Sequence, residues 1–337
     1  MKRLSLLICA LAGIVLWSPA TAGQSPRVEI RMATPVPKGT IWDKSLNVMG
    51  AKWSRGTSQR LTLIVHPMGA YGDDDSVVRQ MRFDNPQAAA LTAIGLSRID
   101  KAFSALGLPF FYESYDELNH VAAALTPELK KRAAAKGFVF LAWTHTGWAY
   151  LFSKERVATV DDLKKVKLFT SLGDEPMVQW YRSNGFQPQA LSYTDIALSL
   201  ESGMITALPA PPSAVNAFNW WKRASHMVDT PIAPVVGAVV MTQKTFDRIS
   251  EADRVVLLEA ARQLEDEVRQ AVPEFEKQSI KAMQNNGLVV TKVEASRWTT
   301  PLQSVATSLR GTMVQPDLFD MALKARDEYR AKRAVKH

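Results

Sequence analysis

Tryptophan and histidine side chains gather in one short segment of the chain. Trp143-Thr144-His145-Thr146-Gly147-Trp148 holds two indoles and an imidazole, and a further tryptophan pair follows at Trp220-Trp221. Indole faces bind apolar, aromatic or cationic groups, and an indole or imidazole N–H donates a hydrogen bond that orients a ligand. The pattern indicates non-covalent binding, although ordinary core packing explains each single tryptophan equally well.

Signatures of catalysis are missing from the sequence. It contains no G-x-S-x-G, H-E-x-x-H, G-x-x-x-x-G-K or G-x-G-x-x-G motif. The histidines are His66, His120, His145, His226 and His337. No two of them lie on one predicted element with the spacing of metal ligands. Asp73-Asp74-Asp75 is interpreted as a helix start rather than a cation site. We therefore expect no enzymatic activity, no metal and no cofactor.

The elements that would position these side chains begin with a β-α-β unit. The residues of 28–33 and 61–65 have the short, β-branched or alternating pattern of strands, and 88–93 is a further predicted strand. Between the first two strands, 42–55 carries a helical stripe of large apolar side chains, and 73–83 is also predicted to be helical. A mainly parallel sheet with crossover helices is the simplest fold for this order.

The middle of the chain is predicted to contain one more helix and two strands. Thr126-Pro127 has the cap and first-position proline of a helix that ends at Gly137. A buried strand is predicted over 138–143 and a separate one over 148–153. Because ligands of open α/β sheets lie at the carboxyl ends of strands, Trp143 to Trp148 is expected at a ligand site.

The longest helical pattern in the chain begins after Ser250. It extends past Pro273 to Asn285, which predicts about 30 residues with a kink at the proline. Its apolar face is predicted to contain Val255, Leu258, Ala261, Leu264 and Val268. The amphipathic segment 315–329 is expected to cover either the core of its own chain or that of a partner, so monomer and homodimer both stay open.

Length and composition fit two globular domains behind an export signal. The chain has 337 residues, of which 47% are hydrophobic and 22% charged. Lys2-Arg3, the apolar stretch 4–17 and Ala20-Thr21-Ala22 make a signal peptide over 1–22, which contains the single cysteine, Cys9. The signal peptide predicts a periplasmic protein. The basic runs have no interleaved aromatic residues, so we expect no binding of nucleic acid.

Six motifs in register resemble the DctP-type solute-binding proteins of TRAP (tripartite ATP-independent periplasmic) transporters. Individually each motif is weak, and together they cover nearly all of the predicted mature chain. Leu108-Pro109-Phe110-Phe111 resembles the family's "lPFlf" segment and Lys136 to Trp143 its "GlkvLgw" strand. Residues 161–167, DDLKKVK, resemble the family's "peDLkGlKiR" motif. The others are Ile30-Arg31-Met32-Ala33-Thr34 with Gly39 and Trp42, Leu61 to Pro67 with Gly69 and Gly72, and 199–211.

The resemblance implies a two-domain α/β fold of the periplasmic-binding-protein (Venus-flytrap) type, with mainly parallel sheets. A ligand cleft would lie between the domains and a long helix would span both. The expected domains are 23–149 with about 236–268, and 150–235 with about 269–310, followed by a C-terminal helix and basic tail over 311–337. The implied function is capture of a small-molecule ligand and its delivery to the membrane permease subunits.

Three positions depart from the family pattern. Phe169 stands where an arginine normally grips the ligand carboxylate, Thr206 where the pattern has aspartate, and Ala210 where it has asparagine. A buried anion without its partner loses about 3 to 5 kcal/mol, so a small carboxylate is a poor ligand. The hypothesis is a neutral, aromatic or hydrophobic ligand, or a cation stacked on indoles. Its expected contacts are Phe169, Ala210, Pro209, Thr206, Trp143, His145, Trp148, Trp220, Tyr71 and Trp42.

Two other interpretations stay open at this point. Arg182 or another basic residue would restore an organic-acid site if the alignment slips at Phe169. Alternatively, the liganded protein would act as a sensor that docks on a membrane receptor kinase, because domain closure creates a partner surface in both roles.

Overall fold

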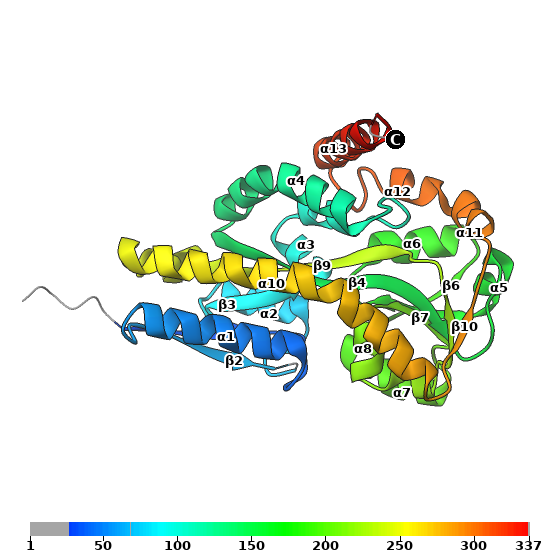
Figure 1. The fold of residues 1–337 in the computed structure, drawn as a ribbon, viewed down its shortest axis with the longest axis horizontal. Coiled ribbons are helices and arrows are strands. Elements are labelled where there is room, and N and C mark those ends of the chain that lie inside the picture. Colours follow the sequence, from blue (N-terminus) through cyan, green and yellow to red (C-terminus); the bar gives the residue numbers. More distant parts are fainter. Residues whose placement is uncertain (1–26, 68, 336–337) are drawn as a thin grey trace, which may run out of the picture.

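The computed structural model describes residues 27–67 and 69–335, and Figure 1 shows how their elements are arranged. The predicted signal peptide and Cys9 lie outside these residues. The elements form two lobes joined by shared strands and by one long helix. This is the two-domain flytrap fold expected from the sequence, and its strands belong to one mixed sheet.

The first lobe contains the predicted β-α-β start. Its elements are β1 (Val28–Ala33), α1 (Ile41–Gly56), β2 (Leu61–His66), α2 (Asp74–Met81), β3 (Ala88–Thr92) and α3 (Ala93–Ile99). β1 lies between β2 and β3 and pairs with both in parallel. The apolar stripe of α1 is buried, and the Thr40 hydroxyl caps the helix by accepting a hydrogen bond from the Asp43 N–H. The sequence-based strands and helices of this lobe are confirmed to within two residues at each end.

The second lobe repeats this parallel arrangement. Its elements are α5 (Val160–Lys165), β5 (Lys167–Ser171), α6 (Glu175–Ser183), β6 (Gln187–Leu191), α7 (Ile196–Ser202), β7 (Ala207–Ala210) and α8 (Pro212–Ala217). β5 pairs in parallel with β6 along its whole length and with β7 at Leu168. The carboxyl ends of these strands therefore face the same side of the lobe.

Two long antiparallel strands, β4 (Phe138–Ser153) and β9 (Ala233–Thr242), connect the lobes. β4 pairs with β9 as far as Ala149 and with β7 from Tyr150 onward. The prediction of two separate strands was therefore wrong, and the segment from Trp143 to Trp148 is not the end of a strand. A register shift between His145 and Gly147 accommodates the glycine, whose φ is 111°, so the strand continues through it.

The helix α4 (Tyr115–Ala135) also begins earlier than the sequence predicted. Ser114 is the cap, since its hydroxyl accepts from the Glu117 N–H at 3.2 Å and the Glu117 carboxylate accepts from the Glu113 N–H at 2.9 Å. The predicted cap, Thr126, instead donates its hydroxyl to the Ala122 carbonyl inside the helix. Pro127 is thus an interior residue.

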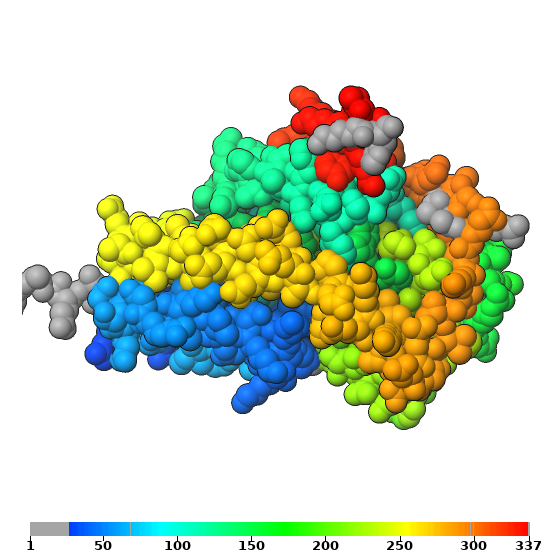
Figure 2. All heavy atoms as spheres, in the orientation of Figure 1, coloured from blue at the N-terminus to red at the C-terminus, as the bar shows by residue number. Residues whose placement is uncertain are grey.

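The long helix α10 (Glu251–Gln284) crosses both lobes, as Figures 1 and 2 show. Its cap is Ser250 as predicted, and Pro273 lies inside the helix, which bends along its course in Figure 1. The predicted apolar face was wrong at its start, because Val255 is 68% exposed and Leu258 is 41% exposed. The buried side begins at Leu257 and continues through Ala261, Leu264 and Val268.

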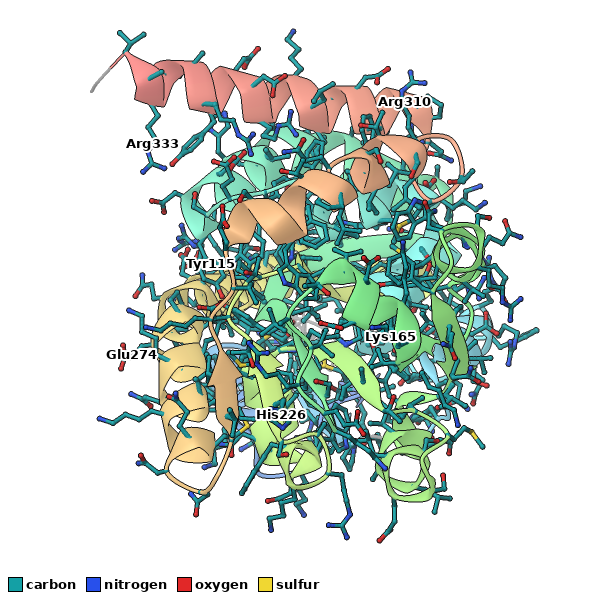
Figure 3. The ribbon with its side chains drawn as sticks, turned by 90° about the vertical axis from the view of Figure 1, so that its right-hand side faces the viewer. Tyr115, Lys165, His226, Glu274, Arg310 and Arg333 are labelled. Carbon is teal, nitrogen blue, oxygen red and sulfur yellow. The ribbon has the colours of Figure 1, made fainter. Side chains whose placement is uncertain are left out.

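The C-terminal helices cover the side of the molecule that carries α4. They are α11 (Ala295–Leu302), α12 (Ser304–Ser308) and α13 (Pro316–Ala334), and Figure 3 shows α13 lying across that end. α13 packs on α4 and buries Leu318, Phe319 and Ala322, so the amphipathic segment covers the core of its own chain. None of the described helices is long and apolar enough to cross a membrane. The remaining elements are η1 (Lys101–Gly107), η2 (Tyr193–Asp195), η3 (Trp220–Lys222), β8 (His226–Val228), α9 (Gln243–Asp247) and β10 (Val289–Thr291).

Candidate functional site

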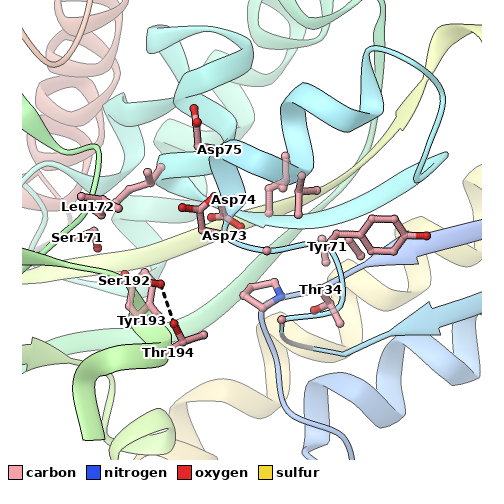
Figure 4. A pocket seen from close by; sticks show the side chains of 18 of the residues that line it. Thr34, Tyr71, Asp73, Asp74, Asp75, Ser171, Leu172, Ser192, Tyr193 and Thr194 are labelled. Atoms are coloured by element: carbon pink, nitrogen blue, oxygen red, sulfur yellow. Dashed lines mark hydrogen bonds between the residues drawn. The ribbon is translucent and has the colours of Figure 1, made fainter. Parts of the chain in front are cut away.

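A cleft lies where the carboxyl ends of parallel strands from the two lobes meet. The first lobe contributes the residues that follow β1, β2 and β3, and the second contributes the ends of β5 and β6 with the turn after β6. The cleft holds about 740 Å³ of space and is open to solvent. Figure 4 shows Asp73 to Asp75 on one side of it and Ser171, Leu172 and Tyr193 on the other.

The carboxylates of the first wall are already bound by the protein. Asp73 Oδ1 caps α2 by accepting from the Ser76 N–H at 2.8 Å. Asp74 accepts from both the hydroxyl and the N–H of Thr92, and burial raises its pKa. Asp75 pairs with two arginines of its own lobe. The three aspartates thus form a helix start, as predicted, and the described residues contain no group of three His, Cys, Asp or Glu that would hold a metal ion.

The second wall presents exposed apolar surface to the cleft. Leu172 is 54% exposed and Tyr193 is 41% exposed, and both line the cavity. The ring of Tyr193 packs on Phe169, with 5.5 Å between ring centroids. Next to it, the hydroxyls of Ser192 and Thr194 lie 3.0 Å apart. This wall can therefore bury an apolar ligand and offer hydroxyl groups to it.

A smaller side pocket of about 560 Å³ adjoins the cleft. The two share Thr34, Pro35, Ala90 and Leu91 as lining residues. The side pocket continues between α1 and the crossing strands, where most of its lining is apolar: Val36, Trp42, Leu46, Val235, Val236, Leu264 and Val268. Its polar groups are mainly hydroxyls, including those of Thr144 and Thr146 on β4.

Among the aromatic residues predicted for the site, two line these cavities. Tyr71 lines the cleft and Trp42 lines the side pocket. The Trp42 indole also donates to the His145 carbonyl at 3.1 Å. The other three tryptophans are buried in cores: Trp143 against Phe103 and Phe140, Trp148 against Tyr115, and Trp220 stacked on Phe218.

The residues predicted from the family departures lie behind the second wall. Phe169 and Ala210 are buried in the core of the second lobe, 3% and 6% exposed. Pro209 is half-buried in β7, and the Thr206 hydroxyl accepts from the Lys167 N–H at 3.0 Å. Phe169 reaches the cleft through its contact with Tyr193 rather than by lining it.

The cleft and the side pocket lack basic residues. Among their described lining residues there is no lysine and no arginine. Arg182, the residue considered as a relocated anchor, is exposed in the last turn of α6 and is not part of either lining. A ligand carboxylate would therefore meet aspartates and hydroxyls here, without an opposite charge.

His145 makes the stability of the protein depend on pH. Burial, with the nearby charge of Arg269, lowers the pKa of His145 from 6.5 to about 4. The folded protein therefore holds a neutral imidazole, whose stabilising contribution is complete above pH 6.5 and is lost as the pH falls toward 4. We expect a loss of up to about 3 kcal/mol of unfolding free energy from this group.

Urea unfolding of wild type and His145→Gln at several pH values between 4 and 7 tests this effect. The quantity of interest is the difference between their free energies of unfolding. Contributions of the other titrating groups cancel in that difference. The difference should change steadily below pH 6.5, and parallel curves for the two proteins would contradict the assignment.

Sequence reasoning missed Leu172, Ser192 and Tyr193. Their signal was available, because they stand at the ends of parallel strands, where ligands of α/β sheets lie. The same rule was applied to β4, which runs through both lobes without ending at the cleft. β6 itself was not predicted, since Gln187-Pro188-Gln189 lacks the β-branched pattern of a strand.

Comparisons with known proteins agree with this arrangement. A curated solute-binding protein of Sulfitobacter sp. (strain NAS-14.1) is 25% identical over 175 residues, which are 50% of this chain and 52% of that protein, so the chain spans about half the length of that relative. A TRAP periplasmic solute-binding protein from Xanthobacter autotrophicus Py2, solved with bound β-D-galacturonate, is 18% identical with a TM-score of 0.82 and covers 88% of this chain and 99% of that one.

DctP7 of Bordetella pertussis, an extracytoplasmic solute receptor binding pyroglutamic acid, is 17% identical with a TM-score of 0.82, covering 89% of this chain and 99% of that one. These likenesses show the fold. The family model for bacterial extracellular solute-binding proteins of family 7 matches residues 32–310, most of the sequence. Because this model matches most of the chain, and the structure has two lobes with a cleft between them, the chain belongs to the DctP family, bacterial extracellular solute-binding protein family 7.

Proposed function

We propose that this protein is the periplasmic binding component of a TRAP-type transporter, and that its ligand is neutral and at least partly apolar. The lobes would close on the ligand and deliver it to the permease subunits in the membrane. The observation that carries the ligand class is the absence of lysine and arginine from the described lining of the cleft and the side pocket.

Charge decides between a carboxylate and a neutral ligand. A buried carboxylate without a partner loses about 3 to 5 kcal/mol, which weakens binding by about a hundredfold to several thousandfold. Asp73 is exposed on the wall where such a ligand would bind, and its carboxylate adds repulsion. The solved neighbours named above were captured with galacturonate and pyroglutamic acid, so this proposal separates the chain from them by ligand class.

Apolar contact supplies the favourable energy for a neutral ligand. Leu172 and Tyr193 expose apolar surface on the second wall, and Trp42 with Val236 lines the side pocket. Each Å² of apolar surface removed from water contributes roughly 25 cal/mol. The hydroxyls of Thr34, Ser192 and Thr146 are placed to orient polar atoms of the ligand.

Calorimetry with matched ligands tests the proposal. D-galacturonate and D-galactose differ only in the carboxylate, pyroglutamate is a second acid, and indole is a neutral aromatic probe. We expect both acids to bind with dissociation constants above about 1 mM. Native mass spectrometry of the purified protein should show retained cargo without a carboxylate. Micromolar binding of either acid would overturn the proposed ligand class.

A further inference from the structure

One arginine connects the two lobes across the outer end of the cleft. Arg98 belongs to α3 of the first lobe, and its Nε lies 3.1 Å from Oδ1 of Asp75 in the same lobe. Its Nη2 donates at 3.2 Å to the carbonyl of Gly173, which lies between β5 and α6 of the second lobe. A single guanidinium therefore links a carboxylate of one lobe to a backbone carbonyl of the other.

The glycine at position 173 fits this contact in two ways. Its φ of 91° lies in the left-handed region that glycine adopts without strain. A Cβ atom at this position would lie 2.3 Å from Arg98 Nη2, closer than two such atoms can approach. The arginine and the bare backbone are thus matched to each other across the cleft.

Arg98 is also held in place from its own side. Asp75 pairs with Arg98 and with Arg79, which lies one turn further along α2. Arg98 lines a third cavity of about 950 Å³ on the outer side, while Asp75 lines the cleft. Ile94 lines both cavities, so the Arg98 contact stands at the boundary between them.

We propose that Arg98 is a latch that stabilises the closed arrangement of the two lobes. Its guanidinium is committed to Asp75 and to the Gly173 carbonyl, so it acts on lobe closure rather than as an anchor for a ligand. Closure of the lobes is part of the proposed transport function, so the latch proposal rests on that function. A half-exposed charge-assisted contact of this kind shifts a two-state equilibrium by about threefold to tenfold.

The distance between the lobes in ligand-free protein tests the latch. Spin labels are attached to Phe83→Cys in the first lobe and Leu198→Cys in the second, where the native side chains are 85% and 69% exposed. The single native cysteine, Cys9, lies in the predicted signal peptide, so the predicted mature chain carries labels only at the two introduced cysteines. In Arg98→Gln, the closed-to-open ratio read from the distance distribution should fall threefold to tenfold.

Arg79→Gln is the matched control, because Arg79 pairs with the same carboxylate without reaching the second lobe. It should leave the distribution of the wild type unchanged. An unchanged distribution in Arg98→Gln, or an equal shift in Arg79→Gln, overturns the latch. Thermal melting of each variant followed by circular dichroism confirms that it is folded.

Gly173→Ala breaks the same contact from the other lobe. Arg98→Gln and Gly173→Ala should open the protein to a similar extent, and the double variant should open no further than either alone. Additive opening would contradict a shared contact. These measurements use no ligand, so their failure leaves the carboxylate test of the proposed function untouched, and the reverse also holds.

Discussion

Replacement of Glu276 by alanine is expected to lower the free energy of unfolding by about 4 kcal/mol. The Glu276 carboxylate is buried and accepts three hydrogen bonds, from the Tyr115 hydroxyl at 3.0 Å, the Trp148 N–H at 2.8 Å and the Tyr150 hydroxyl at 3.1 Å. Each buried donor left without a partner costs about 1 to 3 kcal/mol. Urea unfolding with linear extrapolation measures the loss.

The position of Glu276 explains why its effect should be large. Trp148 and Tyr150 flank the point where β4 changes its partner from β9 to β7, so the carboxylate ties α10 to the strand where the strand passes between the lobes. Burial raises the pKa of Glu276, which agrees with its position. A Cβ at Gly147 would lie 2.7 Å from the carboxylate, so glycine is required beside it.

Glu274 provides the control for this prediction. It lies on the same helix two positions earlier, and Figure 3 shows its side chain pointing away from the molecule. Glu274→Ala should change stability by less than about 0.5 kcal/mol. Glu276→Gln keeps one acceptor oxygen and should cost about half as much as the alanine variant. Equal losses for Glu274→Ala and Glu276→Ala would contradict the role assigned to the buried carboxylate.

Glu265 makes a second contact of the same kind as Glu276, between a carboxylate of α10 and a backbone N–H of β4. Its carboxylate accepts from the Trp143 N–H at 2.8 Å. The two glutamates are separated by about 16 Å along a helix, at 1.5 Å per residue, and their two strand partners by about the same length, at 3.3 Å per residue. The buried face of α10 therefore carries polar side chains at the positions where β4 offers N–H groups.

The contacts between α10 and β4 show which parts of the fold could be predicted from the sequence. Hydrophobic spacing predicts α1 and α10 because large apolar side chains recur on one face of each. It misplaces the apolar face of α10 at Val255 and Leu258, since the side that packs on β4 includes Glu265 and Glu276. Buried carboxylates with backbone partners are not visible in a hydrophobic pattern, because their partners are distant in sequence.

The candidate site was only partly predictable for a similar reason. Trp42 and Tyr71 line the cavities, but the choice of Trp143, Trp148 and Trp220 rested on residue type, which does not distinguish a cavity wall from a core. Strand direction does distinguish them, because only the parallel strands end at the cleft. The continuous β4 could not be separated from two shorter strands at Gly147 by sequence alone.

Phe169→Ala is expected to destabilise the protein by about 3 kcal/mol. The ring is 3% exposed and packs in the core of the second lobe with Ile196, Leu200 and Leu208, while its edge supports Tyr193. Truncation of a buried phenylalanine to alanine removes apolar burial and leaves a cavity, and such changes cost about 3 to 5 kcal/mol. Chemical unfolding of the purified variant gives the value.

Two companion variants separate a core role from a place on the cleft wall. Phe169→Leu keeps most of the apolar volume and should cost less than about 1.5 kcal/mol. Leu172→Ala lies on the wall itself, 54% exposed, and should change stability by less than about 0.5 kcal/mol. If Phe169→Ala behaves like Leu172→Ala, the ring faces the cleft and contacts the ligand directly. A large loss for Phe169→Ala alone means that the Phe169 ring serves the core of the second lobe, and that Tyr193 is the aromatic side chain that lines the cleft.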